Sequence, residues 1–333
     1  MTAKSSRTPD QVNAAMRMVD EAEGTPAEKA EMLMEIAMTM QQKPQASSDI
    51  ETAVQLYETA LTLTSETMPL LTARIRARMA TALMTIPSED TSPLERAREE
   101  LETALGTLTA QASDEEVAEA EMNLGLVLQN LAPFHKARIQ DCISAYQRAL
   151  RTFDKQAHPK EFAILQNNLA TAFLSIPFTD EKAKMREALA VQAFEEGLAV
   201  VTLIDHPSEY AMLQNNLGNA LQYVSSSHRV ENGFRAIEAY DEALKIRDRR
   251  NAPGEYANTI SNKANCLANL PDNPADPEKG NPRNLSAAIG LYSEALGIFH
   301  ETGDHQKAQA VEEALEELRQ DLSPMPLQAN GAH

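Results

Sequence analysis

The feature that most constrains this chain is a sequence pattern that returns six times with a nearly constant period. The phrase LQNNLATAF begins at Leu165 and returns as LQNNLGNAL at Leu213. An alanine marks the same place in six successive segments, with gaps of 43, 45, 45, 48 and 46 residues: Ala30, Ala73, Ala118, Ala163, Ala211 and Ala257. Self-similarity at a fixed period is typical of repeat proteins, in which each repeat packs against its neighbours.

A second phrase follows the first in every segment and carries a small, a large and a small residue at positions i, i+4 and i+7. These spacings place all three residues on one face of a helix. The six sets are Ala53/Tyr57/Ala60, Ala97/Leu101/Ala104, Cys142/Tyr146/Ala149, Ala190/Phe194/Gly197, Ala236/Tyr240/Ala243 and Ala288/Tyr292/Ala295. The small residues admit a neighbouring helix while the large one fills the space between them. We therefore predict an all-α chain built from six helix pairs.

The composition agrees with packed helices. Aromatic residues make up 5% of the chain and tryptophan is absent. The two cysteines, Cys142 and Cys266, lie far apart, so they form neither a disulfide framework nor a zinc site. Cys142 replaces alanine on the small–large–small face, and Cys266 lies in a first helix of the pattern. We expect both thiols to be buried and inert.

The second-helix pattern, together with Leu-Gly or Leu-Ala in the first helix, resembles the tetratricopeptide repeat. The units are longer than that repeat by about a dozen residues, and HPSEYAMLQNNLGNAL is similar to the long repeats of kinesin light chains and their bacterial relatives. The resemblance implies a right-handed α-α superhelix, a tetratricopeptide-like solenoid of about six helix pairs plus capping helices. The first two units depart from the pattern, since Glu35 and Arg78 stand where later units have asparagine.

The repeat pattern also predicts the organisation of the chain. We expect a disordered N-terminus, an N-terminal helix, six repeats, a capping helix and a disordered tail, with no linker long enough to divide the array. The expected boundaries are 1–8 for the disordered N-terminus, 9–25 for the N-terminal helix, 305–322 for the capping helix and 323–333 for the disordered tail. The six repeats are expected at 26–68, 69–113, 114–159, 160–207, 208–253 and 254–304.

The net charge of −19 opposes nucleic-acid binding, which requires a basic surface. No secretory signal and no apolar run of membrane-spanning length occurs in the sequence, so we expect a cytoplasmic protein without membrane insertion. No phosphate-binding loop, dinucleotide fingerprint or nucleophile elbow is present. We therefore expect no enzyme activity, no cofactor and no metal site.

Candidate binding residues follow from the resemblance, in which one stripe of each first helix lines a concave groove that binds extended peptides. Carried over position by position, it implies recurring groove residues along three successive levels of that stripe. They are Asn123, Asn168, Asn216 and Asn262, then Asn219 and Asn265, and then Asn130, Tyr223 and Asn269. In the second unit Arg74 and Arg78 share this stripe, where they either clamp a carboxylate or form a solvated basic face.

The chemistry of these residues allows two interpretations. An amide side chain both donates and accepts, so a column of amides suits the backbone of an extended segment. Alternatively, each asparagine bonds the adjacent helix and holds the curvature of the repeats. In the groove interpretation, truncating Asn168 or Asn216 to alanine costs far less stability than truncating Leu217, which faces the core.

Methionines mark the stripe in the first unit. Met34 and Met38 stand beside Glu31 and Glu35. Flexible thioethers suit an adaptable binding surface, although methionine stripes also fill cores.

The sequence therefore predicts a protein–protein interaction scaffold, adaptor or dedicated chaperone whose partner is another protein or an extended peptide. Two alternatives stay open: a ligand-responsive sensor that binds a small peptide or metabolite in the groove, and, more remotely, an enzyme on a helical-repeat scaffold. Such repeats serve unrelated roles, so the fold alone does not choose between them.

Overall fold

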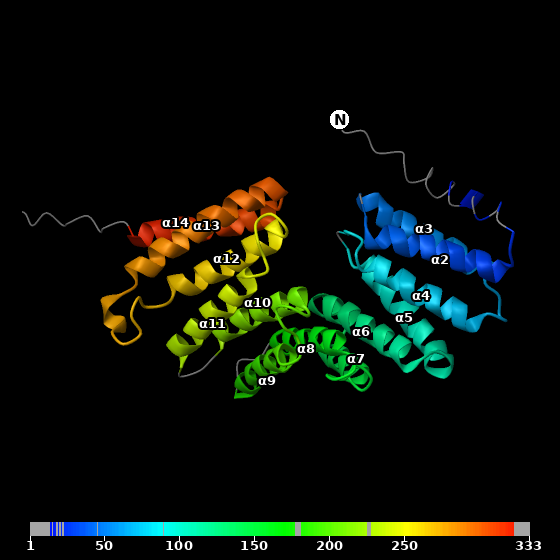
Figure 1. Ribbon diagram of the computed structural model, residues 1–333, viewed down its shortest axis with the longest axis horizontal. Coiled ribbons are helices and arrows are strands. Elements are labelled where there is room, and N and C mark those ends of the chain that lie inside the picture. Colours follow the sequence, from blue (N-terminus) through cyan, green and yellow to red (C-terminus); the bar gives the residue numbers. More distant parts are fainter. Residues whose placement is uncertain are drawn as a thin grey trace, which may run out of the picture. The chain divides into compact units, whose positions relative to one another are not determined.

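Helices account for the regular structure of this chain. The computed structural model describes residues 23–44, 46–88, 90–176, 181–224 and 228–322, with isolated positions between 14 and 21. Within these residues it contains thirteen α-helices, α2 to α14, and two short 3-10 helices, and it contains no strand (Figure 1). The prediction of an all-α fold is confirmed.

The first helix of each pair begins at a residue that is well suited to a helix start. Five of these helices carry proline in their first turn, where the missing N–H costs nothing. The sixth, α6, is capped by Ser113, whose hydroxyl accepts a hydrogen bond from the backbone N–H of Glu116. The first helices are α2 (Pro26–Gln42), α4 (Pro69–Leu83), α6 (Asp114–Leu131), α8 (Pro159–Leu174), α10 (Pro207–Tyr223) and α12 (Pro253–Ala268).

The second helix of each pair packs antiparallel against the first, and these are the most extensive helix contacts in the structure. The second helices are α3 (Ser47–Leu63), α5 (Ser92–Gln111), α7 (Ile139–Ala149), α9 (Glu181–Leu198), α11 (Arg229–Leu244) and α13 (Pro282–Thr302). The helix α14 (His305–Leu322) follows and packs on α13. The 3-10 helices η1 (Ala132–Phe134) and η2 (Pro277–Lys279) lie in connections.

Two compact units divide the chain between Asp154 and Lys155, in the segment that follows α7. The N-terminal unit holds α2 to α7 and the C-terminal unit holds α8 to α14. Within each unit, first helices of neighbouring pairs contact each other, as α2 does α4 and as α10 does both α8 and α12. No comparable contact joins neighbouring second helices among the described residues. The first helices therefore form the inner face of each unit.

The small–large–small pattern occupies the centre of the helix pairs, as predicted. Tyr57, Tyr146, Phe194 and Tyr240 are fully buried, and so is Leu101 in the second pair. Because the aromatic residues are few and widely spaced along the chain, each pair is built around one large side chain.

Two glycines allow the closest ring contacts. A Cβ atom on Gly125 would lie 2.4 Å from Cε1 of Tyr146, and one on Gly218 would lie 2.6 Å from Cε1 of Tyr240. Real Cβ atoms do not approach other atoms so closely, so the ring occupies the space that a side chain would need. The Leu-Gly of the repeat phrase is thus a packing requirement in the third and fifth pairs.

Both cysteines are buried, as expected from the sequence. Burial raises the pKa of each thiol to about 12, which keeps the sulfur protonated and unreactive near neutral pH. Cys266 packs in the same core cluster as Phe194 and Tyr240.

The helix α14 covers the end of the C-terminal unit. Ala308, Val311 and Leu315 are buried against the last pair, while Glu312 and Glu316 are exposed. Solenoids need a terminal element with a polar outer face of this kind.

The predicted disordered segments 1–8 and 323–333 lie outside the described residues, as does most of the helix expected over 9–25. The repeat boundaries and the right-handed superhelical path stay predictions. No helix in the described part of the chain combines the length and the apolarity that crossing a bilayer requires.

Candidate functional site

A chain of amide side chains connects the three first helices of the C-terminal unit. Asn262 Nδ2 donates to Asn215 Oδ1 at 3.3 Å, and Asn215 Nδ2 donates to Asn216 Oδ1 at 3.0 Å. Asn216 Nδ2 donates to Asn167 Oδ1 at 2.8 Å, and Asn167 Nδ2 donates to Asn168 Oδ1 at 3.2 Å. Each inner amide therefore donates once and accepts once. We call these five residues the asparagine ladder.

The asparagine ladder contains two residues that sequence reasoning missed. Asn167 and Asn215 are each 7% exposed, so they lie between helices rather than in an open groove. Their neighbours Asn168 and Asn216 are half-buried on the inner face. The signal was the doublet itself, because consecutive helical residues point about 100° apart and cannot both face the groove. Two of the four contacts, Asn216 to Asn167 and Asn262 to Asn215, cross between helices, as the structural interpretation expects, and the other two join neighbouring residues of one helix.

The asparagine ladder changes the expected cost of truncating Asn216. Its side chain bonds two buried amides, so Asn216→Ala leaves Asn215 Nδ2 and Asn167 Oδ1 without those partners. We expect a loss of about 1–3 kcal/mol in the free energy of unfolding, the usual cost of an unsatisfied buried polar group. Urea denaturation followed by circular dichroism measures it.

The matched control is Asn269→Ala. Asn269 is exposed at the C-terminal cap of α12, and its amide donates to the carbonyl of Asn265, with no other side-chain hydrogen bond among the described residues. That variant should stay within about 0.5 kcal/mol of the parent chain. Equal stability of the two variants would mean that the asparagine ladder contributes nothing to folding.

The second and third levels of the predicted stripe meet around an exposed aromatic ring. Tyr223 is 68% exposed, and its hydroxyl accepts a hydrogen bond of 2.7 Å from Asn265 Nδ2. Asn219 instead accepts a 2.8 Å hydrogen bond from the buried hydroxyl of Tyr240. The structure thus brings Tyr223, Asn265 and Asn269 together, while Asn219 also anchors the core ring of its own pair.

Two hollows share Tyr223 as a lining residue. The first has a volume of about 320 Å³ and lies between α8, α9 and α10, while the second, of about 440 Å³, lies between α10, α11 and α12. Most of the surface of the first is apolar and includes Phe173 and Leu174, while Arg186 and Glu187 add charged groups. Polar residues dominate the second, which includes Asn265 and Asn269. A single exposed ring therefore borders surfaces of different character.

In the N-terminal unit the candidate arginines are engaged with carboxylates of the next first helix. Arg74 approaches Glu116 at 3.0 Å, and Arg78 approaches Glu119 at 2.7 Å with a second contact of 3.2 Å. All four side chains are between one third and one half exposed. Ion pairs of this kind contribute little to stability, about 0–1 kcal/mol each. Both arginines are thus paired with carboxylates of this chain, and their role in binding a partner stays a prediction.

These ion pairs border a cavity of about 190 Å³ between α2, α4 and α6. Met34 and Met38 line it, and Asn123 completes its wall on α6. Asn123 therefore lies with Arg74 and Arg78 in the N-terminal unit, and it takes no part in the asparagine ladder.

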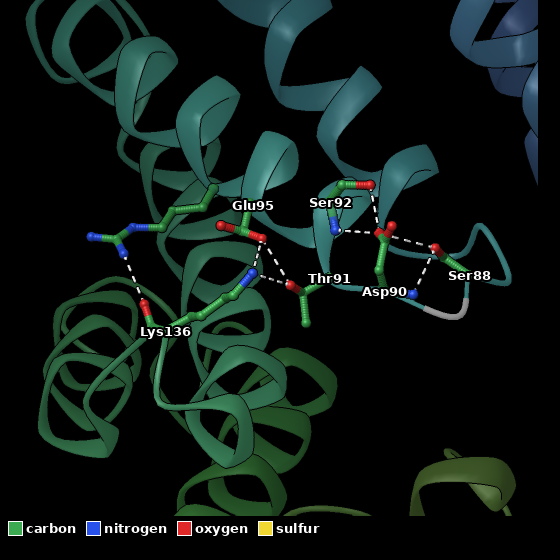
Figure 2. A network of polar contacts seen from close by, with 7 residues as sticks. Ser88, Asp90, Thr91, Ser92, Glu95 and Lys136 are labelled. Carbon is green, nitrogen blue, oxygen red and sulfur yellow. Dashed lines mark hydrogen bonds and ion pairs between the residues drawn. The ribbon is translucent and has the colours of Figure 1, made fainter.

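A polar network fixes the start of α5 in the N-terminal unit (Figure 2). Lys136 Nζ donates to Thr91 Oγ1 at 2.6 Å and to Glu95 Oε1 at 2.5 Å, which lowers the pKa of the Glu95 carboxyl. Asp90 accepts hydrogen bonds from the backbone N–H and the hydroxyl of Ser92, and these bonds lower its pKa as well. The network ties the segment after α6 to the second pair, so its role is structural.

Comparison with known proteins agrees with this fold. No protein-family model and no curated protein matches the sequence. Among solved structures, a signal transduction ATPase with numerous domains that carries a tetratricopeptide repeat sensor, from Pyrococcus horikoshii, aligns with a TM-score of 0.56 and 14% identity. The alignment covers 94% of this chain and 47% of that protein.

A second solved structure, BtubC (BKLC) from P. vanneervenii, is 20% identical over 73% of this chain and 92% of its own, with a TM-score of 0.49. The helix pairs, the buried small–large–small faces and the first alignment all describe one architecture. In its fold, the chain is a tetratricopeptide-like helical-repeat protein.

Proposed function

We propose that this protein is an interaction scaffold, an adaptor or dedicated chaperone, whose C-terminal unit binds an extended segment of a partner protein around Tyr223. The observation that carries the proposal is that Tyr223 is 68% exposed and lines two hollows, of about 320 and 440 Å³. An exposed tyrosine offers a rigid apolar face and a polar tip, and such residues dominate binding energy at interfaces.

The neighbours of the ring support this role. Asn265 holds the Tyr223 hydroxyl from the adjacent first helix, which reduces the rotational freedom that the ring would lose on binding. The apolar hollow beside Phe173 and Leu174 suits a side chain of the partner. The polar hollow beside Asn265 and Asn269 suits its backbone, because amides both donate and accept.

The asparagine ladder fits the same proposal in a supporting part. Its inner amides each use one donor and one acceptor for one another, so the ladder sets the spacing of α8, α10 and α12. A fixed spacing of these helices keeps the two hollows in place beside Tyr223. Recognition of the partner then depends on Tyr223, Asn265 and Asn269.

The test is to select peptides from a random library against the full chain and to measure the best one by isothermal titration calorimetry. Tyr223→Ala should weaken binding by about 1–3 kcal/mol, as truncation of an aromatic anchor does. Ile204→Ala is the matched control, since Ile204 is 84% exposed and lines neither hollow.

The control variant should bind as the parent does. If Tyr223→Ala binds the selected peptide with unchanged affinity, or if selection yields no peptide at all, the proposed site is wrong.

A further inference from the structure

The inner face of the N-terminal unit carries a cavity with a mostly apolar surface, and the proposed function does not use it. Its volume is about 190 Å³, and its walls include Met34 and Met38 of α2, Ala77 of α4 and Leu108 of α5. An adjoining hollow of about 770 Å³ shares Met34 and adds further apolar surface on α2 and α4. Methionine side chains are flexible and polarizable, so they adapt to different apolar groups. The cavity therefore suits one bulky apolar side chain.

The charges around this cavity are unbalanced. Arg74 and Arg78 are neutralised by their ion pairs with Glu116 and Glu119. Glu35 borders both hollows and Glu31 borders the larger one, and neither forms an ion pair within the described residues. Glu31 and Glu35 lie one helical turn apart and are both exposed, so their negative potential reaches whatever enters the cavity.

We infer that this face binds a cationic amphipathic peptide segment of a partner protein. One bulky apolar side chain of that segment enters the cavity between Met34 and Met38, and Lys or Arg residues beside it pair with Glu31 and Glu35. The inference does not rest on the Tyr223 site, because the two faces belong to different units and differ in chemistry. The chain's net charge of −19 favours association with cationic segments in general, so the test must separate local recognition from overall attraction.

The probes are three fluorescein-labelled decapeptides with alternating residues: Leu/Lys, Leu/Glu and Ser/Lys. Their binding to the full chain is measured by fluorescence anisotropy at physiological salt. Glu31→Gln/Glu35→Gln removes the local charge, and Glu312→Gln/Glu316→Gln is its control. That second pair is also exposed and also one turn apart, but it lies on α14.

A second variant addresses the cavity. Ala77→Leu fills the space between the methionines without changing charge. Its control is Ala188→Leu, at an exposed position of α9. Circular dichroism on every variant confirms that its helix content matches the parent.

We expect the Leu/Lys peptide to bind and the Leu/Glu peptide not to bind. Glu31→Gln/Glu35→Gln should weaken the Leu/Lys complex by about tenfold, the worth of two partly exposed ion pairs. Ala77→Leu should weaken it by about fivefold or more, because the apolar anchor is excluded. The Ser/Lys peptide should bind more weakly and should not respond to Ala77→Leu.

Several results would overturn the inference. Equal weakening by the α14 control pair would show general attraction to an acidic chain. Binding of the Leu/Glu peptide, equal binding of the Ser/Lys peptide, no binding of any peptide, or an affinity that Ala77→Leu leaves unchanged would each exclude this site. If Tyr223→Ala weakens binding and the variants of the N-terminal unit do not, the peptide binds the C-terminal unit instead.

Discussion

Replacing Leu217 with alanine should lower the free energy of unfolding by about 2–5 kcal/mol. Leu217 is 8% exposed and packs in the core cluster that includes Leu213, Phe194 and Tyr240. The truncation removes buried apolar surface and leaves a cavity that the rigid helix pairs fill only in part. Urea denaturation monitored by circular dichroism measures the loss.

Leu189→Ala is the control for this prediction. It removes the same atoms from α9, where Leu189 is 39% exposed. We expect its cost to be less than about 1 kcal/mol. If both variants lose the same stability, Leu217 does not pack in the core as the structure has it.

Adding a single methyl group at Gly218 should destabilise the chain by about 1–3 kcal/mol. In an open helix position the same change stabilises by about 0.5–1 kcal/mol, because alanine is the better helix former. Here the new Cβ would lie 2.6 Å from Cε1 and 2.9 Å from Cζ of Tyr240. The ring cannot withdraw freely, since it is fully buried and its hydroxyl bonds Asn219 and Gln222.

Gly297→Ala is the control, and it should stabilise the chain instead of destabilising it. Gly297 lies within α13 and no atom lies within 4 Å of the place where its Cβ would stand, so alanine should stabilise that helix. Tyr240→Leu removes the ring atoms that the new Cβ of Gly218→Ala would meet. Gly218→Ala should therefore cost less in a Tyr240→Leu background than in the parent chain. Stabilisation by Gly218→Ala in the parent chain would contradict the close ring contact.

The sequence predicted the positions of the candidate site residues but not their hydrogen-bond partners. Counting along the repeats was enough to bring Asn216, Asn262 and Asn168 to one face, because equivalent positions in stacked helices become neighbours. It was not enough to tell whether an amide side chain bonds a partner or another amide. The choice depends on side-chain directions and on the separation of the helices. The burial of Asn167 and Asn215 and their hydrogen bonds to Asn216 show that these amides bond one another.

The arginines show the same division. Their place on the stripe followed from helical spacing, yet the sequence left a carboxylate clamp and a solvated face equally open. The structure adds contacts across 41 and 42 residues, in which Arg78 and Arg74 meet Glu119 and Glu116 of the next first helix. Such pairs carry no local signature, because either partner alone looks like an ordinary surface charge.

The sequence by itself determined the helix pairs, their number and the face that each second helix buries. These properties depend on local periodicity, and Tyr57, Tyr146 and Tyr240 occupy the buried centres that the spacing predicts. Only the tertiary structure decided the division between Asp154 and Lys155, the asparagine ladder, and the exposure of Tyr223 beside two hollows. The physical reason is that burial and hydrogen-bond partners arise between helices some 40 to 50 residues apart, where small differences in packing and side-chain direction decide which groups meet.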